Sequence, residues 1–429
     1  MHEPSTPDSL PRAAAAAPEI SALFRQGLAL HQQGQLAAAR TLYAQVLQVQ
    51  PQHFDALHLS GVIALQANQP ELAIDLIGQA LQLNQRQAVA WSNLGLAQKK
   101  LQHLQQAIAS FERAIALQPD FAAAHYNQGL ALHGLRRWAD AVASFDRAIA
   151  LQPDHAEAWA NRGDALEEQK RLDESLASYD QAIALRPHLA EAHAYRGLVL
   201  IGLQRYAEAV DSFDRAVALR PTYIEPWCNR GIALNALHRY EEAIASYDRA
   251  IALMPDFAEG YGNRALSLRM LQRPQQALDD LNRALALRPH YPKAQWSRAL
   301  ALLQLGQYQQ GWQAYEVRWQ HENFSTQQRQ FAQPLWLGEE DVAGKTVLLH
   351  SEQGMGDSIQ FCRYAKLVKA LGATVLLDVP QALAGLLQSV EGVDACFVTG
   401  QPLPPFDLHC PLLSLPLACK TELNSIPSP

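Results

Sequence analysis

The sequence has few cysteines and no long apolar run, which excludes several classes of protein. Its five cysteines are odd in number and include no Cys-x-x-Cys pair, so a disulfide framework is disfavoured and a reducing, cytoplasmic location is expected. No apolar stretch approaches the roughly 20 residues of a membrane-spanning helix, so no membrane span is predicted. The 15 histidines are not spaced as metal ligands, and we expect neither a metal site nor a cofactor.

Positive charge is not in excess either. The chain has 35 Lys and Arg residues against 42 Asp and Glu residues, which gives a formal net charge of −7. Nucleic-acid-binding proteins normally carry a basic face, so no nucleic-acid partner is predicted. Residues 1–19 lack the basic start and the apolar core of a signal peptide, and their composition predicts a disordered tail.

The sequence is dominated by a repeat of 34 residues. Proline recurs at this interval from Pro119 to Pro289, and Pro51 lies two intervals earlier. Two columns of small residues keep the same period: Gly27, Gly61, Gly95, Gly129, Gly163, Gly197 and Gly231 in one, and Ala39, Ala73, Ala107, Ala141, Ser175, Ala209, Ala243 and Ala277 in the other. Three columns in step indicate a repeat architecture of nine units over residues 20–325.

Each unit has the pattern of two helices joined by a turn. In the unit 156–189, Trp159 and Gly163 are four residues apart and share one face of a first helix. Ser175 and Tyr179 share the matching face of a second helix. The small side chains predict a close approach of the two backbones, and the proline that follows ends the second helix.

This order of Trp, Gly, Tyr, Ala, Phe and Pro over 34 positions resembles the tetratricopeptide repeat (TPR). The resemblance implies an all-α solenoid in which neighbouring repeats stack into a right-handed superhelix. In that family the first helices line a groove and the second helices face outward. A protein or peptide partner held in the groove is the function that the resemblance implies.

One column on the predicted first helices is polar. Its members are Asn93, Asn127, Asn161, Asn229 and Asn263, with Tyr195 in the sixth-repeat place. An amide both donates and accepts hydrogen bonds, so evenly spaced amides can hold an extended peptide by its backbone. The column resembles the asparagine ladder of the O-GlcNAc transferases, and we predict that it binds substrate. The alternative is that the repeat consensus merely tolerates asparagine here.

Charged residues also follow the period. The columns are Arg162, Arg196, Arg230, Arg264 and Arg298; Glu157, Glu191, Glu225 and Glu259; and Asp146, Asp180, Asp214 and Asp248. A row of arginines could bind an acidic peptide. The aspartates of the second helices offer nearer partners, so we predict ladders of ion pairs between helices, each of little energetic weight.

The pattern changes after residue 325. Arg318 replaces the small residue that earlier repeats carry at its position, which predicts the end of the array. Residues 326–343 are predicted as a linker. Residues 344–429 are predicted as a partial Rossmann-like α/β unit, with strands at 346–350, 374–379 and 395–399 and helices at 358–371 and 381–390.

The loop SEQGMGD, residues 351–357, follows the first of these strands at the edge where such sheets bind ligands. The run around this loop and the later FDLHCPLLSLP stretch resemble the acceptor lobe of the heptosyltransferases, a family of two-lobed GT-B glycosyltransferases. The resemblance implies that Asp357 is the general base and that Gly354 and Gly356 lie against the substrate. Alternatively, Asp357 caps a helix that begins at Ser358.

Two functions therefore fit the sequence. The first is an interaction scaffold that holds a polypeptide in the groove and carries an incomplete glycosyltransferase-like lobe. The second is a protein glycosyltransferase whose repeats select the acceptor. Residues 344–429 hold about one Rossmann-like unit, so the lobe that binds the nucleotide sugar is expected to be missing. We expect a fragment or a truncated protein that does not transfer sugar alone, and a nucleotide-sugar partner only with a second lobe.

Overall fold

The structure is a computed structural model, and it describes residues 11–320, 328–352 and 354–428. The chain divides into two units, Met1–Arg220 and Pro221–Pro429. No helix in these described stretches has both the length and the apolar character that crossing a membrane requires.

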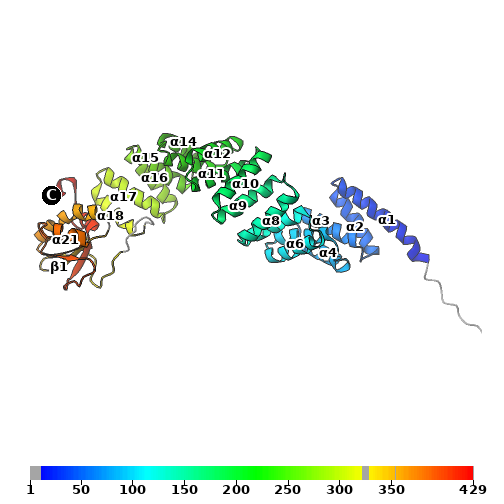
Figure 1. Cartoon of the computed structure of the whole chain (residues 1–429), viewed down its shortest axis with the longest axis horizontal. Coiled ribbons are helices and arrows are strands. Elements are labelled where there is room, and N and C mark those ends of the chain that lie inside the picture. Colours follow the sequence, from blue (N-terminus) through cyan, green and yellow to red (C-terminus); the bar gives the residue numbers. More distant parts are fainter. Residues whose placement is uncertain (1–10, 321–327, 353, 429) are drawn as a thin grey trace, which may run out of the picture. The chain divides into compact units, whose positions relative to one another are not determined.

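The first unit consists of antiparallel helix pairs, each a first helix followed by a second helix (Figure 1). Its helices are α1 (Pro11–Gln32), α2 (Leu36–Val49), α3 (Phe54–Gln66), α4 (Pro70–Leu83), α5 (Ala88–Lys100), α6 (Leu104–Leu117), α7 (Ala122–Gly134), α8 (Trp138–Leu151), α9 (Ala156–Glu168), α10 (Leu172–Leu185), α11 (Ala190–Gly202) and α12 (Tyr206–Leu219). Each second helix also packs against the next first helix within the unit, so the predicted stacking is confirmed. Helix α1 begins at Pro11, inside the predicted disordered tail, and residues 1–10 lie outside the described residues.

The two helices of a pair approach closely because a glycine faces a large side chain. In the fifth pair, a Cβ atom built on Gly163 would lie 3.0 Å from the ring of Tyr179, which is fully buried. The Ser175 hydroxyl donates a hydrogen bond of 2.7 Å to the carbonyl of Gly163 across the same contact. The predicted role of these small residues is therefore confirmed.

The turn inside each pair uses a left-handed residue, and this turn recurs every 34 residues. The residues with positive φ in this column are Gly34, Asn68, Gln102, Arg136, Lys170, Gln204, His238, Gln272 and Gly306. The amide of Asn68 donates to the carbonyl of Leu65, and the amide of Gln69 donates to that of Ala64. These bonds satisfy carbonyls at the end of the first helix, as in a Schellman motif.

Successive repeats are joined by a second recurring bond. The side chain at the Trp159 position donates a hydrogen bond to the carbonyl six residues earlier, usually that of the repeat's proline. The donors are Trp91, His125, Trp159, His193, Trp227, Tyr261 and Gln295. Tryptophan, histidine, tyrosine and glutamine can all make this bond, because each carries a polar hydrogen at the end of a ring or amide.

The second unit opens with three more helix pairs. They are α13 (Ile224–Ala236) and α14 (Tyr240–Leu253), α15 (Ala258–Met270) and α16 (Pro274–Leu287), and α17 (Pro292–Gln304) and α18 (Tyr308–Tyr315). A short 3-10 helix, Glu316–Gln320, ends the array. In the middle pair alanine replaces the usual glycine at Ala265, and Leu281 replaces the usual aromatic residue, so the larger first-helix side chain meets a smaller neighbour.

The rest of this unit is a four-stranded parallel sheet in the order β3-β2-β1-β4. The strands are β1 (Thr346–His350), β2 (Thr374–Val379), β3 (Ala395–Val398) and β4 (Leu408–Pro411). The α-helices are α19 (Met355–Phe361), α20 (Ala365–Ala370), α21 (Gln381–Leu387) and α22 (Leu415–Ala418), with 3-10 turns at Cys362–Tyr364, Leu412–Ser414 and Leu423–Ser425. The main core lies between one sheet face, which includes Leu349 and Leu377, and helix residues such as Val368 and Leu383.

The first three strands of this part were predicted from the sequence. The helices and the fourth strand differ from the prediction. The single helix predicted at 358–371 is split into α19 and α20 by a 3-10 turn, and it begins earlier, at Met355. Ile359 of α19 and Leu371, which follows α20, are about half exposed. Strand β4 was not predicted. The predicted linker packs on the sheet, where the amide of Trp336 donates to the carbonyl of His409.

Candidate functional site

The asparagine column lies on the first helices, and all five side chains are half-buried. In the first unit, Asn93 Nδ2 lies 3.0 Å from His58 Nε2, and Asn161 Nδ2 donates to the Tyr126 hydroxyl at 3.1 Å. Both partners belong to the first helix of the preceding repeat. Asn161 Nδ2 donates also to the carbonyl of Glu157. These amide nitrogens are thus engaged within the array, while the Oδ1 atoms remain as acceptors.

The other members of the column differ in their contacts. Asn127 Oδ1 accepts a hydrogen bond from Lys99 Nζ at 3.1 Å, and its Nδ2 donates to the carbonyl of Ala123. In the second unit, Asn263 Nδ2 is 3.5 Å from Cys228 Sγ, and Asn229 is half-buried on α13. The column therefore helps to hold neighbouring first helices together, which the sequence argument did not predict.

Apolar residues flank these amides on the same helix faces. The residue three positions after the asparagine is apolar in most repeats, and Ile232 and Leu266 are 38% and 44% exposed. Val89, four positions before Asn93, is 50% exposed. We call the exposed side of the first helices, made of the asparagine column and these apolar neighbours, the first-helix face. Amide acceptors beside exposed apolar surface suit the backbone and side chains of an extended peptide.

Arg162, Arg196 and Arg264 of the arginine column form the predicted ion pairs with aspartates of second helices, whereas Arg298 donates to Asn282. Arg162 Nε lies 2.6 Å from Asp146 Oδ1, and its Nη1 donates to Ser178 Oγ at 2.7 Å. The same arrangement recurs at Arg196 with Asp180 and Ser212, and at Arg264 with Asp248 and Asp280. The glutamate column pairs instead with arginines at the ends of second helices: Glu157 with Arg186, Glu191 with Arg220 and Glu259 with Arg288.

The glycine loop after β1 forms the start of α19. Gly354 is the N-cap residue and no side chain caps the helix, so the predicted cap by Asp357 is wrong. Because α19 begins at Met355, Asp357 lies within its first turn and is half-buried. Gly354 has φ −53°, and a Cβ atom on Gly356 would meet nothing within 4 Å. Neither glycine is therefore required by packing, and both are exposed. Gln353 lies outside the described residues.

Beside this loop lies a buried ionic network centred on Arg318. The guanidinium is fully buried and binds Glu352 through two bonds, Nε to Oε2 at 2.8 Å and Nη2 to Oε1 at 3.0 Å. Arg318 also donates to Glu316 and to Ser414 Oγ, and it stacks on the ring of Trp319. Arg318 was predicted to mark the end of the array. Its role in joining the last repeat to the sheet was not predicted, because Glu352 gives no signal of its own in the sequence.

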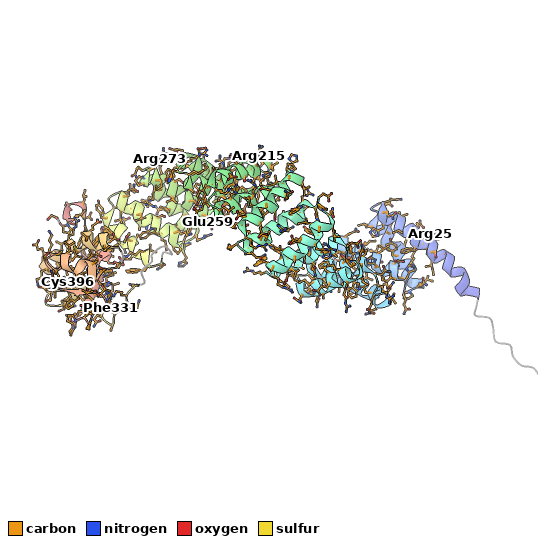
Figure 2. The ribbon with its side chains drawn as sticks, in the orientation of Figure 1. Arg25, Arg215, Glu259, Arg273, Phe331 and Cys396 are labelled. Carbon is orange, nitrogen blue, oxygen red and sulfur yellow. The ribbon has the colours of Figure 1, made fainter. Side chains whose placement is uncertain are left out.

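A second buried polar cluster lies on the sheet face opposite the core. His350 Nε2 of β1 is 3.2 Å from His409 Nδ1 of β4, and Arg329 donates to Asp378 of β2 at 2.6 Å. Phe331, labelled in Figure 2, covers this face with its ring centroid 4.7 Å from that of His409. Burial lowers the pKa of His350 to about 3, with further lowering by Arg329 and His409. The neutral imidazole is therefore the stable form. No pattern in the amino-acid sequence would have identified this cluster.

Comparison with known proteins identifies the repeats. Three family models described as tetratricopeptide repeats match the chain, one at residues 11–88, 134–190 and 263–317, one at 88–121 and 224–257, and one at 190–223. None of them matches beyond residue 317, so the resemblance of the C-terminal part to the heptosyltransferases stays a prediction. No curated protein matches the chain.

Solved structures of repeat proteins are also similar. The TPR protein YrrB, described as having an unusual peptide-binding site, is 21% identical, with 43% of this chain and 95% of that chain covered and a TM-score of 0.40. The pilF structure of Pseudomonas aeruginosa is 20% identical, with 50% and 97% covered and a TM-score of 0.44. A TPR protein from Parabacteroides merdae is 15% identical, with 58% and 98% covered and a TM-score of 0.43. On the family matches and the nine helix pairs of the described residues, the chain belongs to the tetratricopeptide repeat proteins.

Proposed function

We propose that this chain is an interaction scaffold whose first-helix face holds an extended polypeptide. The observation that carries the proposal is the column of half-buried asparagines with apolar neighbours three positions later, which are exposed at Ile232 and Leu266 and half-buried at Leu96 and Leu130. The amide oxygens of Asn93 and Asn161 accept no hydrogen bond from the described residues, and they would accept the backbone N–H groups of a peptide. The ion-paired arginine column does not compete for this role.

The test replaces Asn93, Asn127 and Asn161 together by Ala in the full chain. Each neutral hydrogen bond contributes about 0.5–1.5 kcal/mol, so binding of a peptide selected from a random display library should weaken about ten-fold or more. The control replaces Gln181, an exposed residue of α10, by Ala. Fluorescence anisotropy measures affinity, and circular dichroism checks that both variants fold. If the folded triple variant binds the peptide with the affinity of the wild type, the asparagine column has a purely structural role.

A second candidate function is glycosyl transfer by a lobe of the GT-B kind. The observation that favours it is the exposed glycine loop at the carboxyl end of β1, in a sheet whose order β3-β2-β1-β4 matches the start of the doubly wound order. Glu352 of this loop is held by Arg318, which leaves Asp357 as the loop carboxylate that we propose as the general base. Saturable binding of a nucleotide sugar that is lost in Asp357→Ala or Gly356→Val would support this function. Absence of binding at millimolar ligand would reject it for this chain.

The cytoplasm is the location that fits this proposal. All five cysteines are free thiols in the structure, and three of them are buried. A reducing compartment keeps such thiols unpaired. Secretion would expose the half-buried thiols of Cys396 and Cys419 to oxidation.

A further inference from the structure

A groove lies between α19–α20 and α21, on the helices that cover the core face of the sheet. Its volume is about 390 Å³, and we call it the α19–α21 groove. Cys362 and Leu387 line it and belong to the main core, with 4% and 2% of their surface exposed. Val390 also lines it and packs against the same core. The groove is therefore an open cavity with an apolar floor in the surface of the second unit.

Large apolar side chains on the rim of this groove are exposed. Ile359 of α19 and Leu386 of α21 line the groove from its two sides, and they are 46% and 58% exposed. Met355 lies four positions before Ile359 on the same side of α19 and is 55% exposed. Single exposed apolar residues are ordinary, but several gathered around an apolar cavity mark a site of interaction.

One wall of the groove carries two positive charges, Arg363 and Lys366. Arg363 donates only to backbone carbonyls, through Nε to the carbonyl three residues earlier at 2.7 Å and through Nη1 to that of Pro427 at 3.5 Å. Lys366 Nζ donates to the carbonyl and the hydroxyl of Ser428, at 2.8 and 3.2 Å. Within residues 11–320, 328–352 and 354–428, neither cation forms an ion pair with a carboxylate.

These two cations differ from the other lysines of the sheet-containing part. Lys345 and Lys369 each pair with a nearby carboxylate. The neutral oxygens around Arg363 and Lys366 accept hydrogen bonds and leave the positive charges uncompensated, so a carboxylate brought to this wall would form charge-assisted bonds. Glu391 lines the groove beyond the end of α21, and the residues around the groove keep an excess of positive charge.

We propose that the α19–α21 groove binds an amphipathic helix of a partner protein, with an acidic residue beside the apolar stripe of that helix. The stripe packs on Ile359 and Leu386 and fills the groove, and the carboxylate pairs with Arg363 and Lys366. The exposed apolar side chains lie on both rims and continue one turn along α19 to Met355. A helix covers that width, whereas a single acyl chain does not. This surface is separate from the first-helix face and does not depend on the scaffold function.

The experiment selects a displayed library of binary-patterned amphipathic helices on the full chain, with counter-selection on the variant Leu386→Asp. Leu386 is exposed, so this variant should fold while placing a charge in the apolar rim. The enriched helices should carry Asp or Glu beside the apolar stripe. Arg363→Gln with Lys366→Gln should weaken binding of the best helix about ten-fold in fluorescence anisotropy. The matched control, Lys345→Gln with Lys369→Gln, removes two paired lysines of the same part and should bind normally.

Enrichment without an acidic preference, unchanged binding by the Arg363 and Lys366 double variant, or no enrichment would each overturn the proposal. Binding of laurate that Leu386→Asp abolishes would assign the groove to an acyl chain and would also overturn it. A dimer in sedimentation that Leu386→Asp dissociates would do the same, because the occupant would then be a second copy. Leu386→Asp should leave peptide binding to the first-helix face unchanged, so the two surfaces are tested separately. Circular dichroism establishes that every variant keeps the helical content of the wild type.

Discussion

At the scale of single residues, the spacing of each helix pair depends on one hydrogen atom. A Cβ atom on Gly129 would lie 2.6 Å from Cε1 of Phe145, a distance that real side chains do not tolerate. The eighth repeat carries Ala265 at this position, and there the facing residue is Leu281. A larger residue at the glycine position is therefore matched by a smaller facing residue, an exchange of volume that is expected in a close-packed interface.

We expect Gly129→Ala to lower the free energy of unfolding by about 1–3 kcal/mol, because the added methyl overpacks the contact with Phe145. Adding Phe145→Leu should recover part of this loss, because it copies the eighth repeat. A double-mutant cycle measured by urea unfolding gives the coupling energy. A coupling near zero would contradict the proposed exchange of volume.

A second residue-scale prediction concerns His350. Its pKa is about 3 in the folded chain and about 6.5 when unfolded, so the unfolded chain binds more protons between these values. The stability contributed by the neutral imidazole is complete above pH 6.5 and is lost as the pH falls. The sheet should lose about 2 kcal/mol between pH 7 and pH 5.

The reactivity of the buried Cys410 thiol toward dithiodipyridine reports this loss, with buried Cys228 in the repeats as an internal reference. The ratio of the Cys410 rate to the Cys228 rate should rise about 30-fold from pH 7 to pH 5, because a free-energy change of about 2 kcal/mol corresponds to that factor in an equilibrium constant. His350→Leu should remove most of the rise. The same rise in that variant would show that another group titrates.

At the scale of elements, the turn inside each pair keeps the same backbone conformation although the residue at its left-handed position varies. In the part of the chain that the structure describes, all nine of these turns use positive φ, yet glycine occupies this place only at Gly34 and Gly306. Side chains at the other seven places pay about 1–2 kcal/mol of steric cost for the left-handed conformation. The gain is a short turn that satisfies carbonyls at the end of the first helix.

We expect Gln204→Gly to raise the free energy of unfolding by about 0.5–1 kcal/mol, since φ is +59° there and glycine removes the steric cost. The matched control is Gln181→Gly, an exposed residue inside α10, which should destabilise by a similar amount because glycine disfavours a helix interior. Opposite signs in urea unfolding support the account. Two losses of equal size would refute it.

The sequence predicts these elements well where the signal is local or periodic. The helix pairs follow from the 34-residue columns, and strands such as β2 follow from short buried runs. Strand β4 could not be predicted, because its four residues contain His409 and Pro411 and become a strand only by pairing with β1. The asparagine and arginine columns were visible, but the contacts of their side chains depend on the neighbouring repeat.

At the scale of the whole molecule, the last repeat and the sheet are joined by charge as well as by packing. Arg318 stands in a column that holds a buried alanine from Ala80 to Ala284, and its guanidinium binds Glu352 of the glycine loop. The amide of Leu413 also donates to that carboxylate. Burial raises the pKa of Glu352, and the pairing with Arg318 opposes this rise. The loop that carries Asp357 is thereby fixed to the end of the repeat array.

We expect Arg318→Met to destabilise the second unit by about 3–5 kcal/mol, because it leaves a buried carboxylate without its partner. Arg318→Met with Glu352→Leu should recover much of that loss, since the pair is then replaced by apolar groups. The control Arg171→Met breaks an exposed pair with Glu174 and should cost far less stability, because water screens that pair. Calorimetric unfolding measures all three. Equal losses for Arg171→Met and Arg318→Met would show that burial of the pair is unimportant.

The network around Arg318 also limits where the chain can be divided into modules that recombination could exchange. Separation at residue 325, where the repeat pattern stops, would leave a guanidinium in one piece and its carboxylate in the other. Recombination at that point would thus yield two parts, and each would expose to water a charged side chain that the intact chain buries in an ion pair. An exchange that moves the last repeat together with the sheet keeps the pair intact. The functional boundary of the sheet therefore lies inside the repeat array, upstream of where the sequence pattern places it.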